Sequence, residues 1–236
     1  LGLVEDAPAR LVRVRALSST GQVAAAEAQA RAVLATPVTD EVEREARHEL
    51  AFAYFTQNRA VDAIAEMDRV AALAPTEAVA ARVSAESSFA AAVALDFPGA
   101  ERRAEAAIGG SDDPATQSIA RAVLSLLANF AEEGAKACRL GDEAVALAEQ
   151  PGGEEAARMQ PWFCAALAHM EADHFDVARR LLGTGRQVAK TAGAVWALPG
   201  YDALDAFVLL RAGELDEASA AAARVVPCIG TTDGLR

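Results

Sequence analysis

The stretch LLRAGELDEASAAAARVV, from Leu209 to Val226, places a Gly-Glu-Leu-Asp turn between two apolar segments rich in alanine. Alanine and leucine favour helices, whereas glycine commonly ends them. The stretch therefore predicts the end of one helix, a tight turn and the start of a second helix that packs against the first. Two helices that cross closely need a residue without bulk at the crossing, and Ala218 meets that need.

The same pattern recurs five more times along the chain. Aligning the turns gives one small residue near the start of each second helix, with intervals of 37, 37, 34, 44 and 40 residues. These six anchors are Ala26, Ala63, Ala100, Gly134, Ala178 and Ala218. Helical hairpins of this length cannot bury their apolar faces alone and must stack on their neighbours. We therefore predict an all-α fold, a right-handed α-solenoid of about six helical hairpins, with one concave and one convex face.

The domain organisation follows from the repeat. We expect a single solenoid over residues 1–236, in which each repeat contacts only its neighbours. The longest interval contains EQPGGEE, and its proline and glycines predict a longer or bent connection. A weak joint is therefore expected near residues 150–155. Because the chain begins with Leu1, we expect it to be a fragment of a longer protein.

Charge and hydropathy exclude several kinds of partner. The net charge is −12 and the pI is about 4.7, so phosphate backbones and anionic membrane surfaces would repel this segment. No apolar run reaches the roughly 18 residues that a membrane span needs. Cys138, Cys164 and Cys228 lack the spacing of a zinc knuckle or a disulfide framework, as expected of buried thiols in a reducing cytoplasm.

No pattern in the sequence indicates catalysis or a bound cofactor. The segment GRQVAKT, from Gly185 to Thr191, lacks the second glycine of a phosphate-binding loop and lies within a helical pattern. The carboxylates alternate with arginine along amphipathic helices, as solvated faces usually do. We therefore expect no enzyme and no cofactor.

A metal site is not expected either. In HMEADH, His169 and His174 lie five residues apart, and Cys164 lies five residues before His169. Zinc ligands on one helical face prefer separations of three or four, because five residues turn about 140° around the axis.

Two resemblances to known families add to these predictions. Leu50, Ala51 and Tyr54 stand 13, 12 and 9 residues before Ala63 and resemble the first helix of a tetratricopeptide repeat. From Ala128 to Thr232, GDEAVALAEQ, HFDVARRLLGTGRQVAKTAGAVWALPG and RAGELDEASAAAARVV resemble the repeat region of large ATP-dependent LuxR-type bacterial transcriptional regulators, which include the maltotriose-responsive activator.

The second resemblance implies a role. In that family a nucleotide-binding module precedes the helical-repeat arm and a DNA-reading helix-turn-helix follows it, and the motifs of both are absent from this sequence. The resemblance implies a non-catalytic sensor or protein-interaction arm that binds an effector or a partner in its concave groove. Its partners would be other domains of the same regulator or a separate protein.

The tetratricopeptide resemblance also implies which first-helix positions face the groove. Counting from the anchors, we expect nine residues to face the groove: Glu45, His48, Phe52, Phe55, Arg82, Phe89, Gln160, Phe163 and Phe207. Most of these are aromatic, so the groove is expected to favour a small apolar effector or an amphipathic partner helix. Trp162, Trp196 and Tyr201 could orient a ligand near the fifth and sixth hairpins, although such residues more often pack between repeats.

Two other classes of function stay open. A tetratricopeptide scaffold or adaptor that stands alone would assemble proteins and sense no small molecule. An enzyme on a helical solenoid would need a deep polar pocket that joins perturbed carboxylates or histidines from different hairpins.

Overall fold

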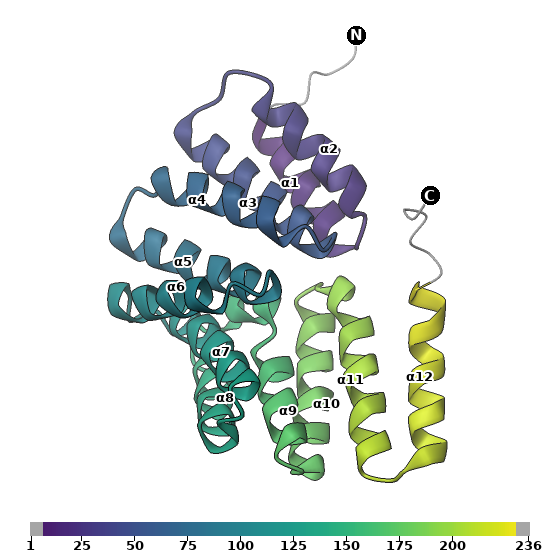
Figure 1. The fold of residues 1–236 in the computed structure, drawn as a ribbon. Helices are drawn as coiled ribbons and strands as arrows, with labels where there is room; N and C mark the ends of the chain where they lie inside the picture. Colours follow the sequence, from purple (N-terminus) through teal and green to yellow (C-terminus); the bar gives the residue numbers. More distant parts are fainter. Residues whose placement is uncertain (1–6, 230–236) are drawn as a thin grey trace.

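The computed structural model describes residues 7–229, and this part of the chain contains helices and turns without any strand (Figure 1). Three hairpins form the N-terminal half: α1 (Ala7–Ser19) with α2 (Val23–Leu34), α3 (Asp40–Thr56) with α4 (Ala60–Ala72), and α5 (Glu77–Val93) with α6 (Phe97–Gly110). Three more follow: α7 (Pro114–Phe130) with α8 (Gly134–Ala148), α9 (Pro161–Glu171) with α10 (Phe175–Thr191), and α11 (Leu198–Arg211) with α12 (Leu215–Ile229). The predicted all-α solenoid of six hairpins is confirmed.

Two short 3₁₀ helices interrupt this regular alternation. The first, η1 (Glu154–Met159), lies between α8 and α9, and the second, η2 (Val195–Ala197), precedes α11. None of the described helices is both long and apolar enough to cross a membrane.

The six hairpin turns share a backbone feature that the sequence hides. In each turn one residue has a positive φ, and it lies five positions before a buried alanine of the second helix. These residues are Gly21, Asn58, Leu95, Glu132, Asp173 and Gly213, with φ between 59° and 82°. Because only two of the six are glycine, a search for glycine finds a minority of the turns.

The shared turn geometry corrects one of the predicted anchors. Gly134 is the first residue of α8 and is half-buried, whereas Ala137, three residues later, is fully buried. The Ala137 N–H donates to the Glu133 carbonyl at 2.9 Å, and the other five anchors make the same bond at 2.8 to 3.0 Å. The prediction of Gly134 was therefore wrong, and the intervals become 37, 37, 37, 41 and 40 residues.

Capping residues explain the strict interval in the first half of the chain. The side chains of Thr39, Thr76 and Asp113 accept hydrogen bonds from the backbone N–H groups of Val42, Val79 and Thr116 and cap α3, α5 and α7. These caps are spaced 37 residues apart. Such a cap satisfies one of the N–H groups left free at a helix start, so it fixes where each first helix begins.

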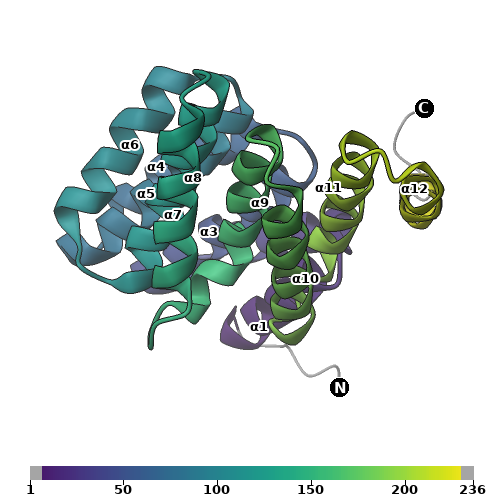
Figure 2. The same ribbon diagram turned by 90° about the horizontal axis from the view of Figure 1, so that it is seen from below.

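The solenoid curls more tightly than the sequence predicts. Helices α1 to α6 run across the view and α9 to α12 run down it, and Figure 2 shows α1 and α3 behind α9 and α10. Trp196 of η2 packs edge to face on Phe52 of α3, with ring centroids 5.3 Å apart. The expectation that each repeat contacts only its neighbours is therefore wrong, because η1 and η2 reach from the fifth and sixth hairpins to the second.

The segment near residues 150–155 forms the turn from α8 into η1, with Gly152 at a φ of 84°. A longer connection does lie there. Its role as a weak joint between subdomains stays a prediction.

Substituting a turn glycine tests the role of the left-handed turn. We expect Gly213→Ala to destabilise the fold by about 1 kcal/mol, because an L-residue pays that cost at positive φ. A Cβ at Gly213 would meet no atom within 4 Å, so the loss would report backbone strain alone. Urea unfolding followed by circular dichroism measures it.

Gly183 in the middle of α10 is the matched control, since a Cβ there also meets nothing within 4 Å and no positive φ is required. Gly183→Ala should stabilise by about 0.5 to 1 kcal/mol. Equal effects of the two substitutions would contradict the assigned turn.

Candidate functional site

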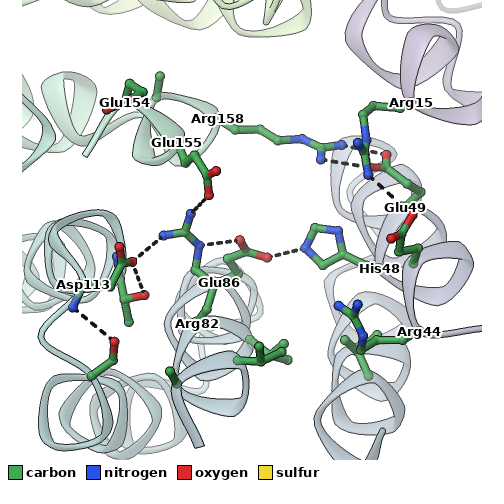
Figure 3. Close-up of a pocket in the computed structure, with 18 of the residues that line it drawn as sticks. Arg15, Arg44, His48, Glu49, Arg82, Glu86, Asp113, Glu154, Glu155 and Arg158 are labelled. Carbon is green, nitrogen blue, oxygen red and sulfur yellow. Dashed lines mark hydrogen bonds and ion pairs between the residues drawn. The ribbon is translucent and has the colours of Figure 1, made fainter. Parts of the chain in front are cut away.

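A cavity of about 670 Å³ opens on the concave side of the solenoid between α3, α5 and η1 (Figure 3). About half of its lining residues are Arg, Asp or Glu. These are Arg15, Arg44, Glu45, Glu49, Arg82, Glu86, Asp113, Glu154, Glu155 and Arg158. Its volume lies in the range of pockets that bind small molecules.

The repeat places the polar side chains of α3 and α5 on the same inner face. Glu45 and Glu49 lie one turn apart on α3, and Arg82 and Glu86 occupy the positions 37 residues later on α5. Residues four apart on a helix share a face, and equivalent positions of stacked repeats face the same groove. The four side chains therefore line one wall.

The first ionic cluster ties η1 to α3. The two terminal nitrogens of the Arg158 guanidinium, Nη1 and Nη2, donate to the Glu49 carboxylate at 3.1 and 2.9 Å, and Arg15 donates to the same carboxylate at 3.3 Å. The Arg158 guanidinium also lies 3.7 Å from the centroid of the Phe52 ring. Glu49 is 1% exposed, and burial alone would raise its pKa, but the hydrogen bond and charge of Arg158, together with the charges of His48 and Arg15, lower that pKa.

The second ionic cluster joins α3, α5, α7 and η1 through His48 and Arg82. His48 forms a short hydrogen bond with Glu86, and Arg82 donates to Glu86 at 3.2 Å. Arg82 also reaches Asp113 at 3.3 Å and Glu155 of η1 at 2.6 Å. Figure 3 shows this continuous chain of charges across the cavity floor.

His48 and Glu86 shift each other's pKa. Burial alone would raise the pKa of Glu86, but the charge of His48 and its hydrogen bond lower it to about 2. Burial alone would lower the pKa of His48, but the Glu86 carboxylate raises it above its usual value. The geometry therefore favours a charged pair.

Two charged side chains of the cavity have no partner among residues 7–229. Arg44 of α3 forms no ion pair or hydrogen bond with another side chain, and neither does Glu154 of η1. Both are drawn without a dashed contact in Figure 3. A guanidinium and a carboxylate are thus free to contact a ligand.

The structure places two of the expected binding residues, His48 and Arg82, in the cavity wall, together with the groove position Glu45. It does not place the aromatic residues there. Phe55 packs against Phe89 and Trp196, with ring centroids 5.5 and 6.4 Å away.

Phe52, Phe55 and Phe89 surround a separate crevice that Met159 of η1 helps to close. Its free volume is about 10 Å³, which is hardly room for one water molecule. Phe52, Phe55 and Phe89 therefore do not line the cavity of Figure 3, and their role in binding stays a prediction.

The remaining candidates lie in the fifth and sixth hairpins. Trp162 and Tyr201 are buried, at 3% and 1% exposure, because both pack around Gly185 of α10. A Cβ at Gly185 would come within 2.6 Å of the Tyr201 ring and 2.7 Å of Trp162. These two rings therefore form interhelical packing.

Phe163 packs against Tyr201, with ring centroids 5.9 Å apart. Phe207 is 60% exposed on α11, and Gln160 forms the left-handed turn before α9. None of the three lines the cavity of Figure 3.

The buried ion pair between η1 and α3 gives a stability prediction. Arg158→Leu keeps an apolar side chain over Phe52 but leaves the buried Glu49 with Arg15 alone, so we expect a loss of about 3 kcal/mol in urea unfolding. Glu155→Gln in the same short helix is the control. The Glu155 side chain is 77% exposed, so its pair with Arg82 should contribute about 0 to 1 kcal/mol. Similar losses in both variants would contradict the buried role of Glu49.

The pair of His48 and Glu86 predicts a pH dependence of stability. A raised pKa of His48 means that its contribution is complete below about pH 6.5 and is lost as the pH rises through the raised value. The lowered pKa of Glu86 means that its contribution is lost only as the pH falls from about 4.5 towards 2.

The urea midpoint should therefore fall as the pH rises above about 6.5, and fall less in His48→Gln. Arg158 opposes the charge of His48 and Glu49 supports it, so both must be kept in the comparison. Equal pH profiles of the two proteins would contradict the pair.

Comparison with known proteins identifies the architecture. No family model and no curated protein matches the chain. It is similar to a chain in the crystal structure of the APC/C hetero-tetramer Cut9-Hcn1, with a TM-score of 0.59 and 14% identity over 94% of this chain and 43% of that one. A putative kinesin light chain of Podosopora anserina with nearly identical TPR-like repeats gives a TM-score of 0.47 and 14% identity, over 82% and 98% of the two chains. This chain thus spans less than half of the first structure, and the shared feature is the TPR-like helical-repeat fold.

Proposed function

We propose that this chain is the sensor and protein-interaction arm of a bacterial transcriptional regulator of the large LuxR type. It binds an effector or a partner in the cavity between α3, α5 and η1. The observation that carries this proposal is the cavity itself, with the free guanidinium of Arg44 in its wall. The TPR-like fold and the LuxR-like sequence from Ala128 to Thr232 support the same role.

The lining of the cavity defines the class of ligand. A guanidinium presents a planar fork of donors that matches a carboxylate or a phosphate. Arg15, Arg82 and Arg158 already bind carboxylates of the protein, so Arg44 is the cation that remains for a ligand. Glu154 offers an acceptor at the opposite wall. The effector proposed for this cavity is therefore a small polar molecule that carries an anionic group and a hydrogen-bond donor.

The proposed mechanism uses the two walls of the cavity. One wall belongs to the second and third hairpins, and η1 precedes the fifth. A ligand that contacts Arg44 and Glu154 together would favour one spacing of these walls. Because α9 to α12 follow η1, a change in that spacing would alter the curl of the solenoid and so reach neighbouring domains.

A non-catalytic role suits the chemistry of the cavity. TPR-like folds are typically scaffolds without catalysis. Glu49 and Glu86 have lowered pKa values because arginine and histidine hold them ionised, which makes them poor proton donors at neutral pH. We further propose a cytoplasmic location, no membrane partner and no direct contact of this segment with nucleic acid, given its charge of −12.

A stand-alone scaffold is the second candidate, and a different surface favours it. Phe97 and Phe130 stack with ring centroids 5.2 Å apart, and Phe130 is 55% exposed. They border a groove of about 450 Å³ formed by α6, α7 and α8. Exposed aromatic rings beside a groove are common at sites that bind proteins.

Fluorescence of a single tryptophan tests the sensor role. The chain has two tryptophans, so Trp162→Phe leaves Trp196, whose ring packs on Phe52 next to Arg158. Dicarboxylates, amino acids and sugar phosphates are titrated in turn. We expect a saturable change with at least one class, at least tenfold weaker in Arg44→Ala.

Arg102→Ala on the exposed face of α6 is the control, and it should bind as the parent does. A response that survives Arg44→Ala, or no response to any polar class, would contradict the sensor role.

The gene around this chain separates the two candidates. An ATPase module before it and a helix-turn-helix after it support the regulator, whereas a reading frame that ends near Arg236 supports the adaptor.

A further inference from the structure

Three side chains that could hold a metal ion meet outside the cavity, where α8, α9 and α10 come together. They are Cys138 of α8, His169 near the end of α9, and His174 in the turn before α10. One ligand atom from each lies within 4.8 Å of the others. A thiol sulfur of α8 and imidazole nitrogens of α9 and of the turn before α10 thus lie close together.

The hairpin turn explains why the two histidines meet. His169 and His174 are five residues apart, which would separate them on a continuous helix. The left-handed residue Asp173 instead reverses the chain, and the His174 N–H donates to the His169 carbonyl at 2.9 Å. The two Nδ1 atoms come to 3.2 Å from each other.

Cys138 reaches the same point because it follows the buried anchor Ala137. Its thiol donates to the carbonyl of Ala168 at 3.5 Å, which holds the sulfur beside His169. Cys164, which the sequence placed nearest to the histidines, belongs to a separate apolar cluster with Ala122 and Ala144.

A carboxylate orients the central histidine. The Nε2 atom of His169 lies 2.9 Å from a carboxylate oxygen of Asp142, one turn after Cys138 on α8. A carboxylate that accepts the Nε2 proton leaves the lone pair of His169 on Nδ1, the atom that faces His174. Histidines that bind zinc are commonly held by such a carboxylate.

We propose that Cys138, His169 and His174 bind a zinc ion, with Asp142 as the positioning residue behind His169. Bonds of about 2.0 to 2.3 Å in a tetrahedron separate ligand atoms by about 3.3 to 3.8 Å. The two nitrogens already stand near that spacing, and a small rotation of the side chains brings in the sulfur.

Zinc suits this mixed donor set of one thiolate and two imidazoles. His169 is buried, whereas His174 is exposed and opens a path from solvent. Three protein ligands leave the fourth position to water or to a side chain of another molecule. The ion would fasten the fourth hairpin to the fifth, beyond the proposed ligand cavity and independent of it.

Cobalt substitution tests the site directly. The full chain without an affinity tag is titrated with Co²⁺, whose thiolate charge-transfer band reports a bound cysteine. We expect one equivalent to bind, with that band present, and Zn²⁺ to displace it and raise the unfolding temperature. Cys138→Ala should remove the band, and Cys164→Ala, which removes the other buried thiol of the described residues, should keep it.

Two further variants distinguish ligands from packing. His174→Ala changes an exposed side chain, so the fold should persist while the cobalt affinity falls at least tenfold. Asp142→Asn should weaken binding about 10- to 100-fold and leave the thiolate band in place at saturation. A missing thiolate band, a band that survives Cys138→Ala, or unchanged affinity in His174→Ala would show that these side chains only hydrogen-bond to each other, and would overturn the proposal.

Discussion

The close crossing of the two helices in each hairpin is the constraint on which the rest of the structure depends. It needs an alanine at the fourth position of the second helix and a left-handed residue five positions before it. Leu95, Glu132 and Asp173 adopt this left-handed conformation although L-residues rarely favour it. Packing of the alanine faces outweighs the local cost of about 1 to 2 kcal/mol per turn.

The regular repeats build a concave surface, and an irregular connection adds charged side chains to it. In the first four hairpins the anchors are 37 residues apart, so equivalent side chains of α3 and α5 fall on one wall. The connection before α9 then inserts η1 into this concave side. Its Arg158 meets the buried Glu49, and its Glu155 meets Arg82. The result is a polar cavity with charged walls, where a regular solenoid would leave an open aromatic groove.

Much of the fold and little of the site could be predicted from the sequence. Alanine and turn residues recur with a period, and a period survives small errors such as Gly134 for Ala137. His48 and Arg82 were found because they repeat with the first helices. The contacts of Arg158 and Trp196 could not be predicted, because both residues lie in connections without a repeat. Each contacts a residue of α3 that lies more than 100 positions earlier in the sequence. Cys138 was missed as a neighbour of His169 for a different reason, since that contact depends on how α8 packs against the hairpin of α9 and α10.

The distance between η1 and α3 in solution tests most directly whether η1 fills the concave side. Spin labels can be attached at the exposed positions Glu41 of α3 and Glu154 of η1 in a background without other cysteines. Pulsed electron paramagnetic resonance then measures the distribution of distances between the two labels. If the ion pair of Arg158 and Glu49 holds η1 in place, the labels give one narrow distance distribution that broadens in Arg158→Leu. A broad distribution already in the protein with Arg158 intact would mean that η1 does not close the groove, and the cavity would lose one of its walls.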